Sequence, residues 1–164
     1  MLAKDLLSSE VKKWLQKSLE SELYASRLYQ HIANNLQRLG YFGGQKHYLS
    51  ESADELKHYQ ILVDFYNDMG SVAPTPKVDA ITDSVMSLSD AISLQYEAEL
   101  DLLKQYEEFY DMVEEKDCIT AQFLLQFIEI QRKSVGDAGD LLAVCKIATD
   151  NKELLFFDKQ LGKK

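Results

Sequence analysis

Helix-breaking residues are scarce in this chain of 164 residues. It has 2 prolines and 7 glycines, and both prolines, Pro74 and Pro76, fall in one short stretch. Proline and glycine are the residues that helices tolerate least. Their scarcity, with abundant Leu, Glu, Lys, Gln and Ala, predicts a nearly all-α fold. The length fits a single domain, residues 1–164, with a sizeable core.

Disulfides, basic charge and long apolar runs are also missing. Cys118 and Cys145 form no CxxC motif, so we expect reduced thiols. The net charge of −9 argues against nucleic acid as a partner, because phosphate binding needs a basic face. No apolar run approaches the roughly 18 residues of a membrane span. Residues 1–14 lack the apolar core of a signal peptide. We therefore expect a cytoplasmic protein that does not bind membranes.

Apolar residues at steps of three and four predict four long helices. We expect these helices at about 9–38, from after Gly43-Gly44 to near Gly70, at about 87–115 and at about 118–148. A long connection over residues 71–87 contains both prolines, and a tail helix follows at about 152–161. Two helical hairpins joined by one crossover form a four-helix bundle, about 9–148, of the ferritin-like type.

Several polar residues interrupt the apolar stripes of these helices. Glu22 lies in the first stripe, Glu55 and His58 in the second, Glu97 near the third and Gln131 in the fourth. An unpaired buried carboxylate costs several kcal/mol, so each needs a partner, a metal or access to water. Antiparallel hairpins bring all of them to one level of the bundle, since they lie at similar distances from their turns.

This set of polar residues is close to a known arrangement for two irons. That arrangement has one Glu from each of two helices and Glu-x-x-His from each of the other two. The first hairpin supplies Glu22 and Glu55-x-x-His58, whereas the second supplies Glu97 and has Gln131 in place of its Glu-x-x-His. One metal position is therefore predicted to be complete and the other to lack a ligand. Carboxylates with one imidazole suit Fe(II).

Over nearly its whole length the chain resembles the non-haem ferritins of the bacterial, maxi-ferritin type. The matching stretches are SELYASRLY around Glu22, SADELKH around Glu55 and His58, QYEAEL around Glu97, FLLQFIEIQ ending at Gln131, and the tail LLFFDKQL. The resemblance implies a ferroxidase that oxidises Fe(II) with O2 or peroxide and stores the ferric mineral. It also implies a homo-oligomeric shell of 24 chains, with the tail helix lining a channel.

The same resemblance implies a role for each site residue. Glu22 and His58 would be terminal ligands of the first iron, and Glu55 would bridge both irons. Glu97 would bind the second iron, with Gln131 in support. In addition, Tyr29 matches the family tyrosine beside the di-iron centre, where it donates an electron or a proton; a simple core aromatic is the other interpretation of Tyr29.

The sequence departs from the family pattern in three ways. Positions where many bacterial ferritins carry glutamates for a third iron are here Asp54, Ile130, Lys133 and Ser134. We therefore expect that third site to be absent or feeble. Ala121 and Leu124 stand where animal ferritins have acidic channel residues, and Leu56 stands where bacterioferritins have their haem-binding methionine. Iron without haem is thus the expected cofactor.

Two other functions remain open at this stage. The same pair of irons serves, in related proteins, to oxidise organic substrates or reduce peroxide, although the missing second Glu-x-x-His argues against that use. Alternatively, the chain is a structural bundle or shell without catalysis, which the altered accessory carboxylates and channel positions favour.

Overall fold

A computed structural model describes residues 4–163, which form five α-helices and no strand. The helices are α1 (Ser9–Leu39), α2 (Phe42–Asp68), α3 (Leu88–Val113), α4 (Cys118–Ile147) and α5 (Asn151–Leu161). The predicted all-α class is confirmed. The start of α2 differs from the prediction, because the helix begins before Gly43-Gly44 and not after these glycines. None of these helices is both long and apolar enough to cross a membrane.

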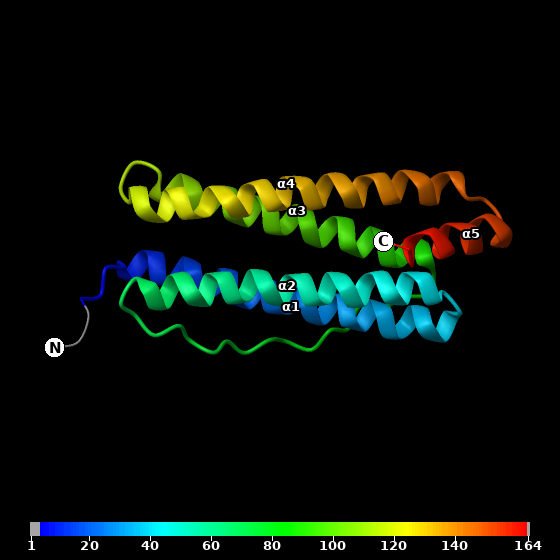
Figure 1. Ribbon diagram of the computed structural model, residues 1–164, viewed down its shortest axis with the longest axis horizontal. Helices are drawn as coiled ribbons and strands as arrows, with labels where there is room; N and C mark the ends of the chain where they lie inside the picture. The colour runs from blue at the N-terminus through cyan, green and yellow to red at the C-terminus, as the bar shows by residue number, and fades with distance from the viewer. Residues whose placement is uncertain (1–3, 164) are drawn as a thin grey trace.

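The helices form two antiparallel hairpins, α1 with α2 and α3 with α4 (Figure 1). The crossover between α2 and α3 runs along the length of the bundle and returns the chain to the end where α2 began. As a result α2 and α3 run parallel. This is the crossover topology expected from the sequence.

Four of the five helices begin with a side-chain cap from the residue just before them. Such a cap accepts a hydrogen bond from a backbone N–H that the helix itself leaves unpaired. The capping residues of α1, α3, α4 and α5 are Ser8, Ser87, Asp117 and Asp150.

Helix α2 is capped differently, by a residue of α5. Tyr41, which precedes α2, makes no side-chain cap. Instead Asp158 accepts hydrogen bonds from the N–H groups of Gly43 at 3.0 Å and Gly44 at 2.6 Å. A Cβ atom on Gly43 would lie 1.8 Å from the Asp158 carbonyl oxygen, so only glycine fits there. This contact explains why α2 runs through two glycines that looked like a break in the sequence.

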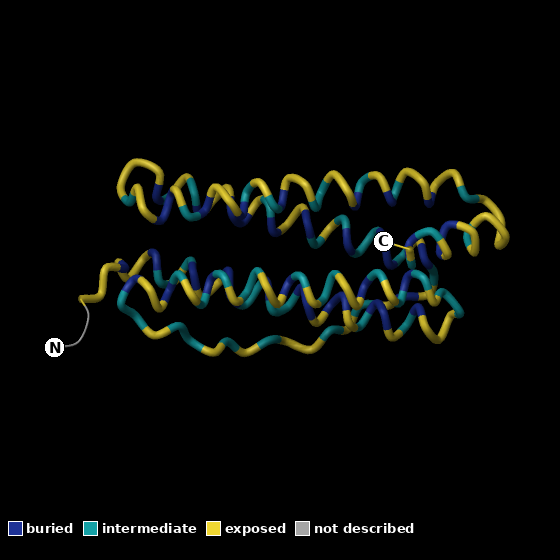
Figure 2. Tube along the Cα trace, in the orientation of Figure 1, coloured by how far each residue is buried: buried dark blue, intermediate teal, exposed yellow. Residues whose placement is uncertain are grey.

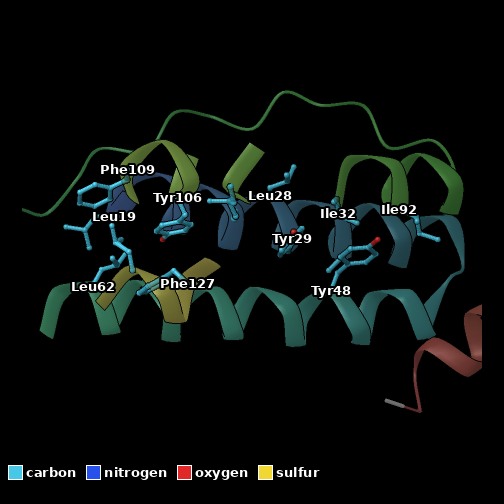
Figure 3. Packing of buried hydrophobic residues seen from close by; sticks show 14 of the residues in the cluster. Leu19, Leu28, Tyr29, Ile32, Tyr48, Leu62, Ile92, Tyr106, Phe109 and Phe127 are labelled. Atoms are coloured by element: carbon cyan, nitrogen blue, oxygen red, sulfur yellow. The ribbon is translucent and has the colours of Figure 1, made fainter. Parts of the chain in front are cut away.

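The core lies between the inner faces of the four long helices (Figure 2). The face of α1 that carries Glu22 is buried along its whole length: Val11, Leu15, Ser18, Glu22, Ala25, Tyr29, Ile32 and Leu36. The largest fully buried side chains include three tyrosines, Tyr29, Tyr48 and Tyr106 (Figure 3). A buried tyrosine hydroxyl needs a hydrogen-bond partner, and here each finds one on another helix.

Candidate metal centre

Glu22 of α1 meets Glu55 and His58 of α2 in the middle of the bundle. One ligand atom from each residue lies within 4.8 Å of the other two. His58 Nδ1 is 3.0 Å from Glu55 Oε2 and 3.7 Å from Glu22 Oε2. Glu22 is 0% exposed and Glu55 3%, so their charges are removed from water. The structure thus brings together three of the predicted ligands in a geometry that one cation can bridge.

Several polar atoms near this level of the core lack a hydrogen-bond partner among the described residues. They are Oε2 of Glu22, Oε2 of Glu99, and both amide atoms of Gln131. Buried polar atoms are almost always hydrogen-bonded, because an unpaired one costs about 1–3 kcal/mol. Two bare carboxylate oxygens and one amide oxygen are ligands that a hard cation such as Fe(II) accepts.

The expectation that Glu97 faces the interior of the bundle is wrong. Glu97 is exposed, whereas Glu99 is fully buried. Residues two apart on an α-helix point to nearly opposite sides, because each residue turns the helix by about 100°. We therefore assign the carboxylate of α3 to Glu99, which sequence reasoning missed. A signal for Glu99 was present in the sequence, since Glu99 lies two helical turns before the aromatic Tyr106 on the same face of the helix.

Tyr29 and Tyr106 each hold one of the buried carboxylates. The Tyr29 hydroxyl donates to Glu99 Oε1, and the Tyr106 hydroxyl donates to Glu22 Oε1. Burial raises the pKa of both tyrosines well above the usual range, so both remain protonated donors. Tyr29 thus lies beside the site, as expected from the sequence. Sequence reasoning did not place Tyr106 in the site.

Gln131 lies in the core on α4, fully buried. Phe127, one turn before it, contacts His58 edge-on with ring centroids 6.4 Å apart. The Phe127 ring also stacks on Tyr106 at 4.8 Å (Figure 3). Helix α4 therefore reaches the level of the site next to both His58 and Tyr106.

The metal-free site holds more protons than its residues carry in water. Burial raises the pKa of Glu55 to about 8 and that of Glu99 to about 8. Burial lowers the pKa of His58, but the neighbouring carboxylates of Glu22 and Glu55 outweigh it and raise that pKa to about 10. A cation entering the site replaces these protons, since metal ligands must be deprotonated.

A polar cavity of 320 Å³ lies one helical turn along α2 from Glu55, and it is lined by Glu51, Asp54, Asp137 and eight other residues. Glu51 lies one turn before Glu55, and burial raises its pKa to about 7. Asp54 forms an ion pair of 2.6 Å with Lys57.

Ala121 and Leu124, which stand where animal ferritins have acidic channel residues, are both buried within the bundle of this chain. Ala121 is 7% exposed and Leu124 is 0% exposed.

Known proteins resemble this chain in both sequence and structure. The Ferritin family, described as "Ferritin-like domain", matches residues 12–148. A probable bacterial non-heme ferritin-like protein of Haemophilus influenzae is 28% identical over 159 residues, covering 96% of each chain. A bacterial non-heme ferritin of Staphylococcus aureus is 24% identical, covering 99% of this chain and 96% of its own.

Among solved structures, an open pore ferritin from the archaeon Archaeoglobus fulgidus superimposes with a TM-score of 0.92. It is 25% identical, and the match covers 96% of this chain and 99% of the archaeal one. With most of the chain matched in sequence and its five helices matched in space, this protein belongs to the ferritin family.

Proposed function

We propose that this chain is the subunit of an iron-storage ferritin that oxidises Fe(II) at a site of two irons. Family and fold support the storage role. The observation that carries the proposed chemistry is the set of buried oxygens without a hydrogen-bond partner among residues 4–163, on Glu22, Glu99 and Gln131, beside Glu55 and His58.

The residues divide between two iron positions. Glu22 and His58 bind the first Fe(II), Glu55 bridges to the second, and Glu99 binds the second with Gln131 in support. The second position has fewer strong ligands than the first. A sparse ligand set leaves room for O2 and lets the ferric product depart toward a mineral store.

The reaction balances without any other reductant. Two Fe(II) ions each give one electron to O2, which takes up two protons and leaves as hydrogen peroxide, and two Fe(III) ions remain. Peroxide serves as the alternative oxidant, accepting the same two electrons and two protons to give water. Tyr29, hydrogen-bonded to Glu99, is positioned to relay one of these protons at the second position.

We also propose that the chains assemble into a hollow homo-oligomer, a shell of 24. Large apolar side chains at the α4–α5 end are exposed, among them Ile147 at 76% and Phe156 at 66%. They border an apolar groove of 600 Å³ between these helices. Apolar surfaces of this kind are typically buried by association.

The first test is iron loading. The purified protein is supplied aerobically with Fe(II) and separated by size exclusion, and iron per chain is measured in the eluting peak. We expect a large particle that retains far more than two irons per chain. A small species with two irons or fewer would defeat the storage role and favour redox chemistry or a structural role.

The second test concerns the site itself. Glu55→Ala and His58→Ala should each slow initial Fe(II) oxidation by about tenfold or more, because each removes a direct ligand. His31→Ala is the matched control, since His31 hydrogen-bonds to the Asp83 carbonyl in the crossover, away from the site. Rates that stay unchanged in both ligand variants, in assembled shells, would refute the site assignment.

A further inference from the structure

The two tyrosine–carboxylate contacts form a reciprocal pair between α1 and α3. Glu22 and Tyr29 lie seven residues apart on α1, and Glu99 and Tyr106 lie seven apart on α3. The Tyr106 hydroxyl of α3 donates to Glu22 of α1, and the Tyr29 hydroxyl of α1 donates to Glu99 of α3. Each helix therefore contributes one carboxylate and one tyrosine that holds the carboxylate of the other helix.

In the contact between Tyr106 and Glu22, one carboxylate oxygen is occupied and the other is left bare. Oε1 of Glu22 accepts from Tyr106, whereas Oε2 has no hydrogen-bond partner among residues 4–163. That bare oxygen is the one that lies 3.7 Å from His58 Nδ1. Two ligand atoms bound to one ion at about 2.0–2.2 Å each are separated by about 3 Å. Tyr106 thus leaves Glu22 turned toward the cation that it would share with His58.

Packing fixes the position of Tyr106 itself. Its side chain is 0% exposed and stacks on Phe127 with ring planes 24° apart. The same Phe127 ring contacts His58 edge-on. One rigid aromatic pair therefore supports both ligands of the first iron position, through a hydrogen bond to Glu22 and through ring packing against His58.

We propose that Tyr106 is a positioning residue for the first metal position, as Tyr29 is for the second. This inference rests on the proposed function, because it requires that Glu22 and His58 bind iron. Tyr106 does not touch the metal; it holds the Glu22 carboxylate in the orientation that binding requires. Losing such an outer-shell hydrogen bond typically costs about 10–100-fold in metal affinity.

The test uses Co(II) as the probe on metal-free, assembled protein. Solution titration gives the affinity of the wild type, Tyr106→Phe and Tyr29→Phe. Crystals grown at limiting Co(II) give the occupancy of each position from anomalous scattering. We expect Tyr106→Phe to weaken the Glu22–His58 position by about tenfold or more and to spare the Glu99 position, and Tyr29→Phe to do the reverse.

Tyr48→Phe is the matched control. It also removes a buried tyrosine hydroxyl, but the partner of that hydroxyl is Gln95, which is not a proposed ligand. Both positions should keep wild-type affinity. In a Glu22→Ala background, Tyr106→Phe should cause no further loss at the first position, because the hydrogen bond has already been removed.

The contrary results distinguish the role of Tyr106 from the proposed function. If the wild type binds two Co(II) ions and Tyr106→Phe binds both equally well, the role of Tyr106 is refuted and the proposed function stands. An equal loss at both positions would also refute it, since that indicates general destabilisation. If the wild type binds no Co(II) at Glu22 and His58, the proposed function itself fails. Tyr29→Phe tests the same pairing from the other helix.

Discussion

Two glutamates of α3, two residues apart, have opposite environments. Glu97 is exposed to solvent, whereas Glu99 is fully buried with one oxygen held by Tyr29 and the other bare. An unpaired buried carboxylate destabilises a fold by several kcal/mol unless it is protonated or bound. With a pKa of about 8, Glu99 avoids this cost by keeping a proton, and a cation bound at its bare oxygen would replace that proton.

Exchanging each of these glutamates for alanine separates the two assignments. Glu99→Ala should reduce Co(II) binding from two ions per chain to one and slow Fe(II) oxidation by about tenfold or more. Glu97→Ala, its matched control on the same helix, should leave both unchanged. Equilibrium dialysis and stopped-flow absorbance measure the two quantities. Losses confined to Glu97→Ala would return the ligand to that residue.

At the site, sequence reasoning found the residue types but not every position. Glu22, Glu55, His58 and Gln131 were identified because each interrupts a clear apolar stripe. On α3, Tyr96, Leu103 and Tyr110 also lie at helical spacing but are only partly buried, so the apolar pattern does not mark the buried face uniquely. The buried face of α3 is itself rich in polar residues such as Gln95 and Gln105, and hydrophobicity alone could not fix its phase.

At the scale of the helices, α5 completes the N-terminus of α2. An N-terminal cap contributes about 0.5–2 kcal/mol, and a carboxylate there also interacts favourably with the helix dipole. The Asp158 carboxylate satisfies two N–H groups at once and is itself buried. Lys46 adds a hydrogen bond from α2 to the Gly162 carbonyl at 2.7 Å. One residue thus supports the docking of the whole of α5.

Asp158→Ala should lower the free energy of unfolding by about 1–2 kcal/mol, because two N–H groups lose their acceptor. It should also speed amide exchange in the first turn of α2. Urea denaturation and hydrogen exchange followed by mass spectrometry measure these effects. Lys159→Ala, a neighbouring exposed position of the same helix, controls for changes in helix propensity. Exchange as slow in Asp158→Ala as in wild type would show that water or another group caps α2 equally well.

The order and approximate ends of the helices were predictable because local residues encode them. Ser8, Gly40 and the apolar steps of three and four are all read within a short window. The start of α2 was not predictable from local residues, because its cap lies 115 residues away from Gly43 along the chain. A contact between residues so far apart leaves no periodic signal for sequence reasoning to detect.

For the whole molecule, the buried site makes stability depend on pH. The pKa of Glu99 is about 8, above its ordinary value of 4.5, and that of His58 is about 10, above 6.5. Between these values the folded chain binds more protons than the unfolded chain. Stability contributed by such groups falls as pH rises. Both groups act in the same direction, so the metal-free protein should be less stable at pH 8 than at pH 5.5.

Glu99→Gln should reduce this pH dependence, because glutamine does not ionise and its amide oxygen still accepts from Tyr29, while His58 and Glu55 still titrate. Between pH 5.5 and pH 8, the free energy of unfolding should fall further in the wild type than in the variant, by on the order of a few kcal/mol. Urea denaturation of chelator-treated protein at pH 5.5 and pH 8 measures it, with Glu97→Gln as the control. A slope in Glu99→Gln as steep as that of the wild type would place the titrating groups elsewhere.

The cap that α5 provides to α2 also has a consequence for synthesis on the ribosome. The bundle helices leave the ribosome before α5 does, so a nascent chain can form the α1–α2 hairpin while Gly43 and Gly44 still lack their acceptor. The first turn of α2 can therefore receive this cap only after Asp158 has left the ribosome. A chain whose translation stalls before that point lacks the acceptor that Asp158 provides to the first turn of α2.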